Sequence, residues 1–222
     1  MLASKKLNTD IRPLKGLDSI PEVEQRMELL DTDYLPVVDS TTHKLIGQAS
    51  RKAIRNLSDD AKYVSDIGLE EAVKVYAAQH IFEAIRLMLL YEMRIIPVVD
   101  EQMTYLGTVQ KQDVLEALTG MLNLTAYGSI VTIELHQRDF SLSEIVHLIE
   151  VEGAKILGVT VEVPDAVSNL YEVSIKLNIE DVSRVAASLR RYGYSVSAES
   201  GTEAFGIDLE TRADELMKYL DM

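Results

Sequence analysis

The chain has 222 residues, of which 47% are hydrophobic and 26% charged, and its formal net charge at pH 7 is −14. The length allows one large domain or two of ordinary size, and the composition is that of a globular protein. The acidic balance disfavours an unassisted nucleic-acid binder, and the absence of cysteine excludes disulfides, thiolate catalysis and thiolate metal sites. No apolar run approaches the roughly 18 residues that span a bilayer, and residues 1–10 lack the apolar region of a signal peptide. We therefore expect a cytoplasmic protein with no membrane and no nucleic-acid partner.

One pattern occurs twice in the first half of the chain. Tyr34–Asp39 (YLPVVD) and Arg94–Asp100 (RIIPVVD) each predict a short buried strand that ends at aspartate, followed by a turn, a second strand and a helix start. When the prolines of the two copies are superimposed, three residue pairs in the preceding helix also coincide: Ile20 with Ile81, Glu22 with Glu83, and Met27 with Met88. The repeat has a period of about sixty residues, and self-similarity of this kind is the strongest indication of architecture in a sequence.

The first copy is predicted to contain three strands and two helices. Its first helix is expected to begin near Ile20, because Ser19 and Glu22 have the spacing of a capping box and the intervening proline is tolerated in a first helical turn. In chain order we predict a short leading strand over 11–14, a helix over 20–30, strands over 35–38 and 44–49, and a helix over 51–57.

The second copy is predicted to have the same order of elements. Val73–Tyr76 alternates and is rich in β-branched residues, which favours a strand. The elements predicted after it are a helix over 81–91, strands over 95–99 and 105–109, and a helix over 111–118. Each copy is therefore a β-α-β-β-α unit.

The residues of both copies resemble those of cystathionine-β-synthase (CBS) domains. The shared marks are a strand that ends in Pro-Val-Val-Asp, a glycine in the next strand, and a polar residue followed three positions later by aspartate. The resemblance covers Asn8 to Gly120. It implies a tandem pair, or Bateman module, that packs about a pseudo-twofold axis and often dimerises. It also implies that an adenosine-containing ligand binds in the clefts between the repeats.

The residues that would form these clefts are divided between the two copies. The second copy has Asp113 but carries Gln110 where the family usually has Thr or Ser, and the first copy has Ser50 but carries Ala53 where the aspartate would stand. Oxygen atoms at these positions can hydrogen-bond ribose hydroxyls, and a helix start suits phosphate. The cations that could contact phosphate are Lys111, Arg51, Lys52 and Arg94, and the apolar strand edge that could cover an adenine face contains Ile96 and Pro97. The alternative is a pair of degenerate clefts that serve only packing and dimerisation.

The pattern changes after Gly120. In chain order we predict a strand over 129–135, a helix that begins after Ser141 and stops at Gly153, strands over 156–163 and 170–179, a helix over 180–192 that Gly193 ends, and a strand over 194–198. Ser141 and Glu144 form a second capping-box pattern, and Gly153 suits a left-handed helix terminus. The order β-α-β-β-α-β is the ferredoxin-like plan.

With its place after a CBS-like pair, this unit resembles an ACT domain, a small regulatory module that often pairs edge to edge and binds amino acids. Asp139 and Leu142 match the loop before the first helix of that family, whereas Phe140 stands at the glycine position. Because that glycine lets ligand and backbone approach closely, we expect a structural or dimerising role here, with amino-acid binding as the alternative. The CBS-CBS-ACT layout resembles acetoin-utilisation protein B and its relatives, although a shared layout does not transfer a pathway.

The whole chain is thus predicted to be an α+β protein with four segments. They are a first CBS repeat over 1–60, a second over 61–122, an ACT-like domain over 128–200, and a C-terminal helix within 201–222. The helix, over 206–222, has one apolar stripe, for which docking on the core is expected and a partner-facing or dimer helix is the alternative.

Sequence motifs of catalysis are lacking. There is no glycine-rich phosphate loop, dinucleotide fingerprint or nucleophile elbow. Glu144 and His147 have the Glu-x-x-His spacing of di-metal bundles, but no matching ligands follow, so His147 is predicted to be an exposed helix residue. We therefore predict a non-enzymatic sensor that requires no cofactor. It would bind AMP, ADP, ATP or a similar ligand and signal to an unknown protein partner through rearrangement of a homodimer or higher homo-oligomer. The competing hypothesis is a structural assembly module.

Overall fold

The computed structural model of the chain describes residues 1–58, 60–164 and 170–200, and these form two compact units, Met1–Leu118 and Thr119–Met222. Each unit is described by itself below. The predicted C-terminal helix over 206–222 lies outside the described residues. Within the described ranges, no helix combines the length and the apolar character needed to cross a membrane.

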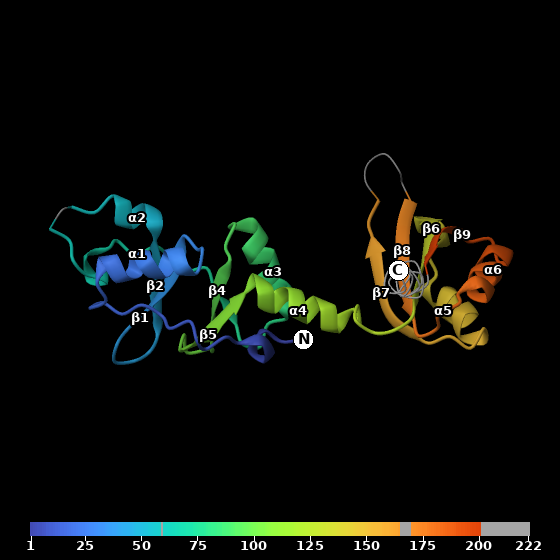
Figure 1. Cartoon of the computed structure of the whole chain (residues 1–222), viewed down its shortest axis with the longest axis horizontal. Coiled ribbons are helices and arrows are strands. Elements are labelled where there is room, and N and C mark those ends of the chain that lie inside the picture. The colour runs from blue at the N-terminus through green and yellow to red at the C-terminus, as the bar shows by residue number, and fades with distance from the viewer. Residues whose placement is uncertain (59, 165–169, 201–222) are drawn as a thin grey trace, which may run out of the picture. The chain divides into compact units, whose positions relative to one another are not determined.

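The first unit contains two repeats that share a helix, a two-stranded hairpin and a second helix, in that order (Figure 1). The second repeat (residues 75–121) confirms the predicted β-α-β-β-α order, and the first repeat (residues 14–55) confirms it except for the leading strand. The first contains α1 (Ile20–Leu29), β1 (Tyr34–Val38), β2 (Leu45–Ser50) and α2 (Arg51–Arg55). The second contains β3 (Val75–Tyr76), α3 (Ile81–Leu90), β4 (Ile95–Val99), β5 (Tyr105–Gln110) and α4 (Lys111–Met121). Short 3-10 turns, η1 (Ala3–Lys6) and η2 (Val64–Asp66), lie in the segments before the two repeats.

The two hairpins have equivalent registers. Both are antiparallel, and in both the register shifts one residue after the strand residue that faces a glycine. The equivalent pairs are Pro36–Gln48 with Pro97–Thr108, and Val37–Gly47 with Val98–Gly107. The turns coincide as well, because the non-glycine residues with positive φ fall at matching positions: Asp31 with Glu92 and His43 with Met103. The sequence repeat is therefore a repeat of backbone conformation.

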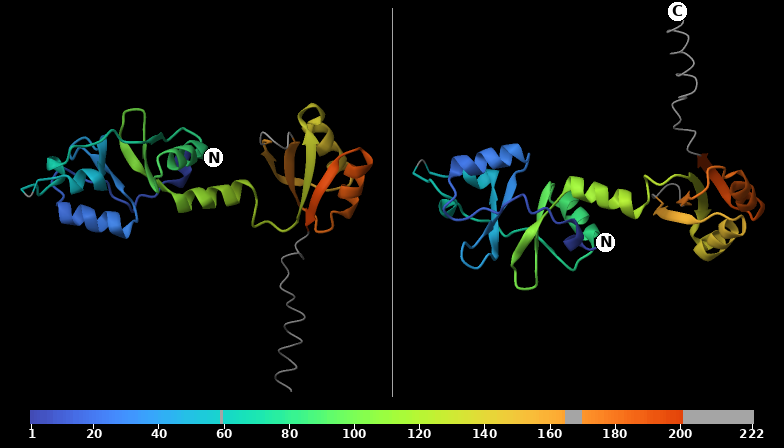
Figure 2. Two further views of the ribbon diagram at one scale, coloured as in Figure 1. Left: turned by 90° about the horizontal axis from the view of Figure 1, so that it is seen from above. Right: turned by 60° about the horizontal axis from the view of Figure 1, so that its bottom comes forward.

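The segment before each repeat crosses to the other repeat. Asn8 exchanges two backbone hydrogen bonds with Thr108 of β5, at 2.7 and 2.9 Å, and Glu70 exchanges two with Gln48 of β2, at 3.0 Å each. Figures 1 and 2 show the N-terminal segment beside the second repeat. The crossings interlock the two repeats and obey the pseudo-twofold relation that the resemblance implied.

Glycine is required where these segments cross. A Cβ atom built on Gly47 would lie 2.9 Å from the carbonyl oxygen of Glu70, and one built on Gly107 would lie 2.9 Å from the carbonyl oxygen of Asn8. A side chain at either position would push two backbones apart. The glycine that marks each copy in the sequence is therefore explained by this approach.

The predicted leading strand over 11–14 is wrong. It is reduced to one isolated parallel bridge, from Leu14 to β1, at the position that β3 occupies in the second repeat. The Ile11 carbonyl accepts a hydrogen bond from the Tyr105 hydroxyl at 2.9 Å. Since that carbonyl bonds to a side chain, it does not continue a strand ladder.

The second unit is a four-stranded antiparallel sheet with two helices. Its strand order is β7-β8-β6-β9, and both α5 and α6 lie on the same face of the sheet (Figures 1 and 2). The elements are β6 (Ser129–His136), η3 (Gln137–Asp139), α5 (Leu142–Val151), β7 (Ile156–Glu162), β8 (Leu170–Leu177), α6 (Ser183–Arg191) and β9 (Ser195–Ser200). This element order and central β8-β6 pair confirm the predicted ferredoxin-like plan.

The core of the second unit lies between the sheet and the helices. Ile133, Ile175, Ile145 and Leu189 are fully buried there, one from each of β6, β8, α5 and α6. Gly153 and Gly193 follow the two helices with φ of +83° and +91°, as predicted for Gly153. Each helix therefore ends just before a glycine in the left-handed conformation.

Both predicted capping boxes fail to form, for different reasons. Neither Ser19 nor Ser141 makes a side-chain capping hydrogen bond to the backbone of the helix that it precedes. At α1 the Ile20 N–H instead donates to the Lys62 carbonyl at 3.0 Å, and at α5 the Glu144 carboxylate accepts from Tyr194. Ser19 itself forms an antiparallel bridge with Tyr63, and Glu144 is the third residue of the predicted box, so in each case a distant segment contacts one member of the box.

The β7 prediction also needs correction. The strand predicted over 156–163 ends one residue earlier, because β7 ends at Glu162, and Val161 and Val163 are 41% and 76% exposed. Ile156 and Val159 of β7 pack on the core.

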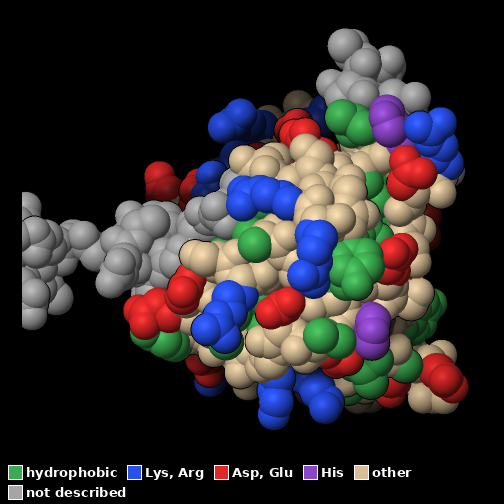
Figure 3. Space-filling view, turned by 90° about the vertical axis from the view of Figure 1, so that its right-hand side faces the viewer, with side chains coloured by type: hydrophobic (Ala, Val, Ile, Leu, Met, Phe, Trp, Pro, Cys, Tyr) green, Lys and Arg blue, Asp and Glu red, His purple; other side chains and the backbone are tan. Residues whose placement is uncertain are grey.

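The surface shown in Figure 3 is mixed in charge. Lys and Arg side chains alternate there with Asp and Glu side chains, and hydrophobic side chains form small separate patches. On this face the described residues form no continuous region of one sign.

Candidate ligand-binding clefts

Ser50 occupies the junction of β2 and α2 in the first repeat. It is 2% exposed, and its Oγ accepts a hydrogen bond from the Ala53 N–H at 3.1 Å, which caps the helix. The same hydroxyl donates to Glu70 Oε1 at 2.5 Å. Ser50, the residue predicted to bind ribose, is therefore a helix cap. Its hydroxyl is held in place by a carboxylate from the segment before the second repeat.

A cavity of about 340 Å³ opens beside Ser50. Three of the residues around it are cations, an unusual concentration in a chain with a net charge of −14. The lining residues are Asp33, Tyr34, Ser50, Arg51, Lys52, Arg55 and Asn56. The volume falls in the usual range for a small-molecule pocket, about 300–1,000 Å³. The cavity is suited to an anionic ligand.

The cations of this cavity differ in how they are held. Arg51 Nε contacts Asp33 Oδ1 at 2.8 Å, and its Nη2 donates to the Thr32 carbonyl at 3.2 Å. Lys52 and Arg55 are exposed on α2. A phosphate that enters the cavity would meet Lys52 and Arg55 directly, whereas Arg51 would have to exchange Asp33 for the new anion.

The second repeat has a different helix start. Asp113 Oδ2 accepts a hydrogen bond from the Gln110 N–H at 2.8 Å, which is the half of a capping box in which the third helical residue contacts the cap residue. Lys111 is exposed at the first helical position, and its N–H donates to the Arg94 carbonyl at 3.1 Å. The structure thus brings Gln110, Lys111 and Asp113 together at one helix start.

The other predicted residues of the second cleft are occupied or buried. The Arg94 guanidinium forms an ion pair with Asp31 of the first repeat, and Ile96 is 0% exposed in the core. Pro97 is buried as well. In this structure neither apolar residue presents a surface to solvent that could cover an adenine.

Two acidic residues of this region, Asp33 and Glu70, were not predicted as site residues from the sequence. Asp33, which binds Arg51, stands at the position equivalent to Arg94, so the repeat alignment could have identified a charge reversal there. Glu70, which lies twenty positions after Ser50 in the chain, contacts it through the crossing segment. No local sequence pattern predicts this contact, because it depends on the pairing of the crossing segment with β2.

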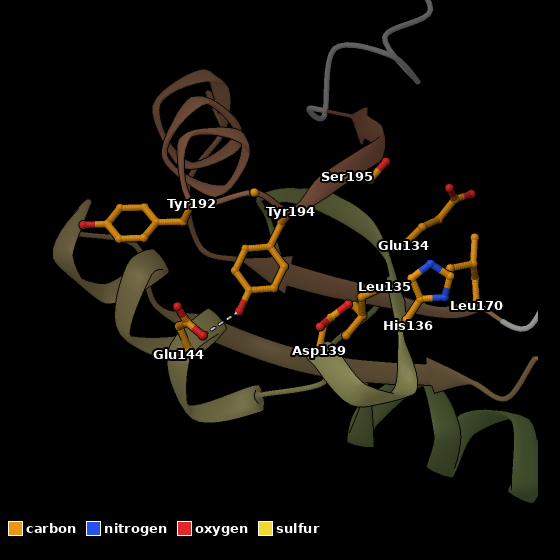
Figure 4. Close-up of a pocket in the computed structure, with 10 residues that line it drawn as sticks. Glu134, Leu135, His136, Asp139, Glu144, Leu170, Tyr192, Tyr194 and Ser195 are labelled. Carbon is orange, nitrogen blue, oxygen red and sulfur yellow. Dashed lines mark hydrogen bonds between the residues drawn. The ribbon is translucent and has the colours of Figure 1, made fainter.

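The second unit contains a larger cavity, of about 580 Å³, between the end of β6 and the start of β9 (Figure 4). Tyr194 points toward Glu144 and donates to its Oε2 at 3.1 Å. Burial and the carboxylates of Glu144 and Asp139 raise the pKa of Tyr194 to about 12, so this phenol remains protonated at neutral pH. The residues that line the cavity are Glu134, Leu135, His136, Asp139, Glu144, Leu170, Tyr192, Gly193, Tyr194 and Ser195.

Phe140 does not occupy this cavity. Its ring packs on the core with Tyr171, at a centroid distance of 5.6 Å. The side chain that replaces the ACT-like glycine is therefore turned inward. His147 is exposed on α5, as predicted, and within the described ranges no three His, Cys, Asp or Glu side chains are grouped to hold a metal ion.

Comparisons with known proteins relate part of the chain to a family. Residues 64–120, which contain the second repeat up to Gly120, match the family model of the CBS domain. A search of curated protein sequences found no match to the chain.

Several solved structures are similar over about half of the chain. A CBS domain pair/ACT domain protein from Thermotoga maritima is 27% identical over 53% of this chain and 96% of its own, with a TM-score of 0.45. The CBS domains of a transcriptional regulator from Streptococcus pneumoniae are 17% identical over 52% of this chain and 98% of their own, with a TM-score of 0.44. CBSX2 in complex with AMP is 21% identical over 53% of this chain and 95% of its own, with a TM-score of 0.45.

Proposed function

We propose that the protein is a non-enzymatic regulator whose two CBS repeats bind an adenosine-containing ligand such as AMP, ADP or ATP. The observation that carries the proposal is the cationic cavity beside Ser50, formed by Arg51, Lys52 and Arg55 in a strongly acidic chain. The CBS match over 64–120 supports an adenosine-containing ligand, because the resemblance to this family implies one. The first repeat is proposed as the other member of the pair on its equivalent register and crossing segment.

The cavity provides a place for each part of a nucleotide. The three cations supply donors for phosphate, with the Arg fork suited to bidentate contact. Ser50 and Tyr34 also line the cavity, and we assign Ser50 to a ribose hydroxyl and the Tyr34 ring to stacking on a base. We therefore place the principal ligand in the Ser50 cleft.

The Asp113 cleft is proposed as the second position. The Asp113 carboxylate uses one acceptor site for the Gln110 N–H, and a carboxylate has about four such sites, so it can also accept ribose hydroxyls. Lys111 supplies a cation there, and Arg94 would do so only after it leaves Asp31. This cleft therefore has fewer available positive charges than the Ser50 cleft.

Regulation is proposed to act through association of copies of the chain. Leu29 at the end of α1 and Leu90 at the end of α3 are equivalent in the two repeats and are 83% and 61% exposed, and Leu89 is 73% exposed. Exposed leucines on matching helix ends support a homodimer or higher homo-oligomer. A ligand can shift such an assembly only if its affinity differs between two arrangements. A protein partner would then recognise one arrangement.

The second unit is proposed to be ACT-like, which gives the CBS-CBS-ACT layout of the acetoin-utilisation protein B type. The sheet order and the cavity after β6 support this assignment. The segment boundaries at 1–60, 61–122, 128–200 and 201–222, a cytoplasmic location, and independence from cofactors, membranes and nucleic acid belong to the same proposal.

A structural assembly module is the second candidate. It is favoured by the fact that several ligand-facing groups already have partners: Ser50 with Glu70, Arg51 with Asp33, and Arg94 with Asp31. In that case the clefts would be closed by the protein's own carboxylates.

Calorimetric titration with AMP, ADP, ATP, NAD and S-adenosylmethionine distinguishes the two candidates. We expect saturable binding of at least one ligand, weakened by the triple change Arg51→Gln, Lys52→Gln and Arg55→Gln. The matched control removes three exposed cations of the second unit, Lys155→Gln, Arg184→Gln and Arg191→Gln. Absence of heat with every ligand at millimolar concentration would overturn nucleotide binding and favour the assembly module.

A further inference from the structure

The position of Glu70 in the first unit is fixed by contacts with residues that are distant in the sequence. Its backbone is fixed on both sides, because its N–H and carbonyl bond to Gln48 at 3.0 Å each. The Gln48 side chain also holds the next part of the segment, since its Oε1 accepts the Val73 N–H at 3.2 Å. The segment can approach β2 this closely because residue 47 is glycine. An exposed carboxylate is thereby held at one place.

That place is the Ser50 hydroxyl. The 2.5 Å contact between Ser50 Oγ and Glu70 Oε1 consumes the only proton of the hydroxyl, and the Ala53 N–H occupies one of its lone pairs. Ser50 alone is then a weak partner for a ribose, which presents two hydroxyl donors on adjacent carbons. The carboxylate has about four acceptor sites and gives one of them to Ser50.

The two repeats differ in where such a carboxylate comes from. In the second repeat it is Asp113, on the helix itself, and the equivalent helix position of the first repeat is Ala53. In the crossing segments the situation is reversed: Glu70 pairs with β2, whereas its counterpart Asn8 pairs with β5 and is uncharged. Each helix start therefore has one carboxylate, supplied by a different segment.

We infer that Glu70 replaces the missing helix aspartate as the ribose-binding carboxylate of the Ser50 cleft, which gives this cleft a preference for ligands with an intact vicinal diol. The inference rests on the proposed function, because it assigns a residue and a ligand preference to the same site. A diol can chelate one carboxylate through two hydrogen bonds, and bonds to a charged acceptor are stronger than neutral ones. A 2′-deoxyribose retains only one of them.

The test compares AMP and ATP with their 2′-deoxy counterparts by calorimetric titration. All proteins carry Asp113→Asn, so that the Ser50 cleft is read without the carboxylate of the other cleft. In this background we expect the ribonucleotide to bind about tenfold more tightly than the deoxynucleotide. Glu70→Gln should remove most of that preference, because it weakens the two bonds of the ribonucleotide and only the single bond of the deoxynucleotide. The Gln side chain has the same size and can still accept from Ser50.

Glu71→Gln is the matched control, because it removes an identical charge from an exposed neighbour. It should retain the preference for ribose. If the Asp113→Asn protein with Glu70→Gln binds ribonucleotide as tightly as the Asp113→Asn protein alone and keeps the preference, the assignment of Glu70 is overturned while nucleotide binding stands. If the wild-type chain binds neither AMP nor ATP, the proposed function fails and the inference fails with it.

Discussion

The helix starts of the two repeats have the same backbone and different chemistry. The hairpin register, the glycine and the crossing pair are equivalent at α2 and α4. At α2 the cap is the Ser50 side chain, whereas at α4 the bond runs the opposite way, from the Gln110 N–H to Asp113. Each repeat thus retains one half of a capping box.

The surrounding charges diverge in the same way. Three cations line the cavity at α2, and the position before β1 is Asp33, whereas the position before β4 is Arg94. What the two repeats share is needed to pack the hairpins and cross the segments. The charged residues that they do not share are mostly exposed, among them Asp33, Arg55 and Arg94. The comparison therefore separates the residues that make the fold from those that give each cleft its specificity.

The largest effect is expected from the shared residues. Gly107→Ala should lower the free energy of unfolding by about 3 kcal/mol and Gly47→Ala by about 2 kcal/mol, because a methyl group at either position meets a backbone oxygen and Gly107 also has a positive φ. Urea unfolding measures both. Gly68→Ala, where an added Cβ meets nothing within 4 Å, is the control and should be nearly neutral. Equal losses of unfolding free energy at Gly47, Gly68 and Gly107 would show that the crossing segments can move away from β2 and β5 without loss of stability.

The divided capping box predicts the next largest effect. Ser50→Ala should cost about 1–2 kcal/mol, because the Ala53 N–H and Glu70 both lose a partner. Gln110→Ser should instead stabilise the protein by about 0.5–1 kcal/mol, since it completes the box with Asp113. Both are measured by urea unfolding against Ser4→Ala, which removes the hydroxyl of an exposed serine in η1. A gain from Gln110→Ala as large as from Gln110→Ser would exclude the box as the cause.

The charge difference predicts unequal responses of ligand affinity. Lys52→Gln with Arg55→Gln should weaken ATP binding about tenfold and flatten its dependence on salt, because each exposed ion pair contributes up to about 1 kcal/mol. Lys111→Gln should weaken it only about twofold to threefold. Titrations with ATP at two salt concentrations measure both the loss of affinity and its dependence on salt. A larger loss from Lys111→Gln would place the principal ligand in the Asp113 cleft.

The smallest effect concerns the aspartates at the ends of β1 and β4. Hydrogen bonds from the Thr42 N–H and hydroxyl and the Thr41 N–H lower the pKa of Asp39 below its ordinary value. A folded-state pKa below the unfolded value stabilises the protein above pH about 4, and that contribution is lost as the pH falls through the folded pKa.

The stability difference between wild type and Asp39→Asn should therefore narrow between pH 7 and pH 3. At Asp100, burial raises the pKa, but bonds from Thr104 and Gln102 outweigh it and the net pKa is also lowered. The stability difference between wild type and Asp100→Asn should therefore also narrow as the pH falls. A difference that widens in acid would contradict this account of both turns.

Much of the fold could be predicted from the sequence. The period of the apolar pattern and the repeated Pro-Val-Val-Asp placed both hairpins, and alternation with two glycine stops placed the ferredoxin-like unit. These signals are local, because strand and helix periodicities are properties of consecutive residues. The cation at position 51 and the carboxylate at 113 were also recognisable, since the second copy provides an internal reference for the first.

Tertiary structure decided which partner each polar group chose. Ser19 and Ser141 have the pattern of caps, but neither side chain caps its helix: Ser19 bridges Tyr63, and the Glu144 carboxylate accepts a hydrogen bond from the Tyr194 hydroxyl. Glu70 has no motif, yet it meets Ser50 because a segment crosses between repeats. A hydrogen-bonding group has only a few sites and gives them to the best-placed partner, near or far in the chain. The sequence by itself therefore determined the elements and their order, while long-range backbone pairing determined the chemistry of the clefts.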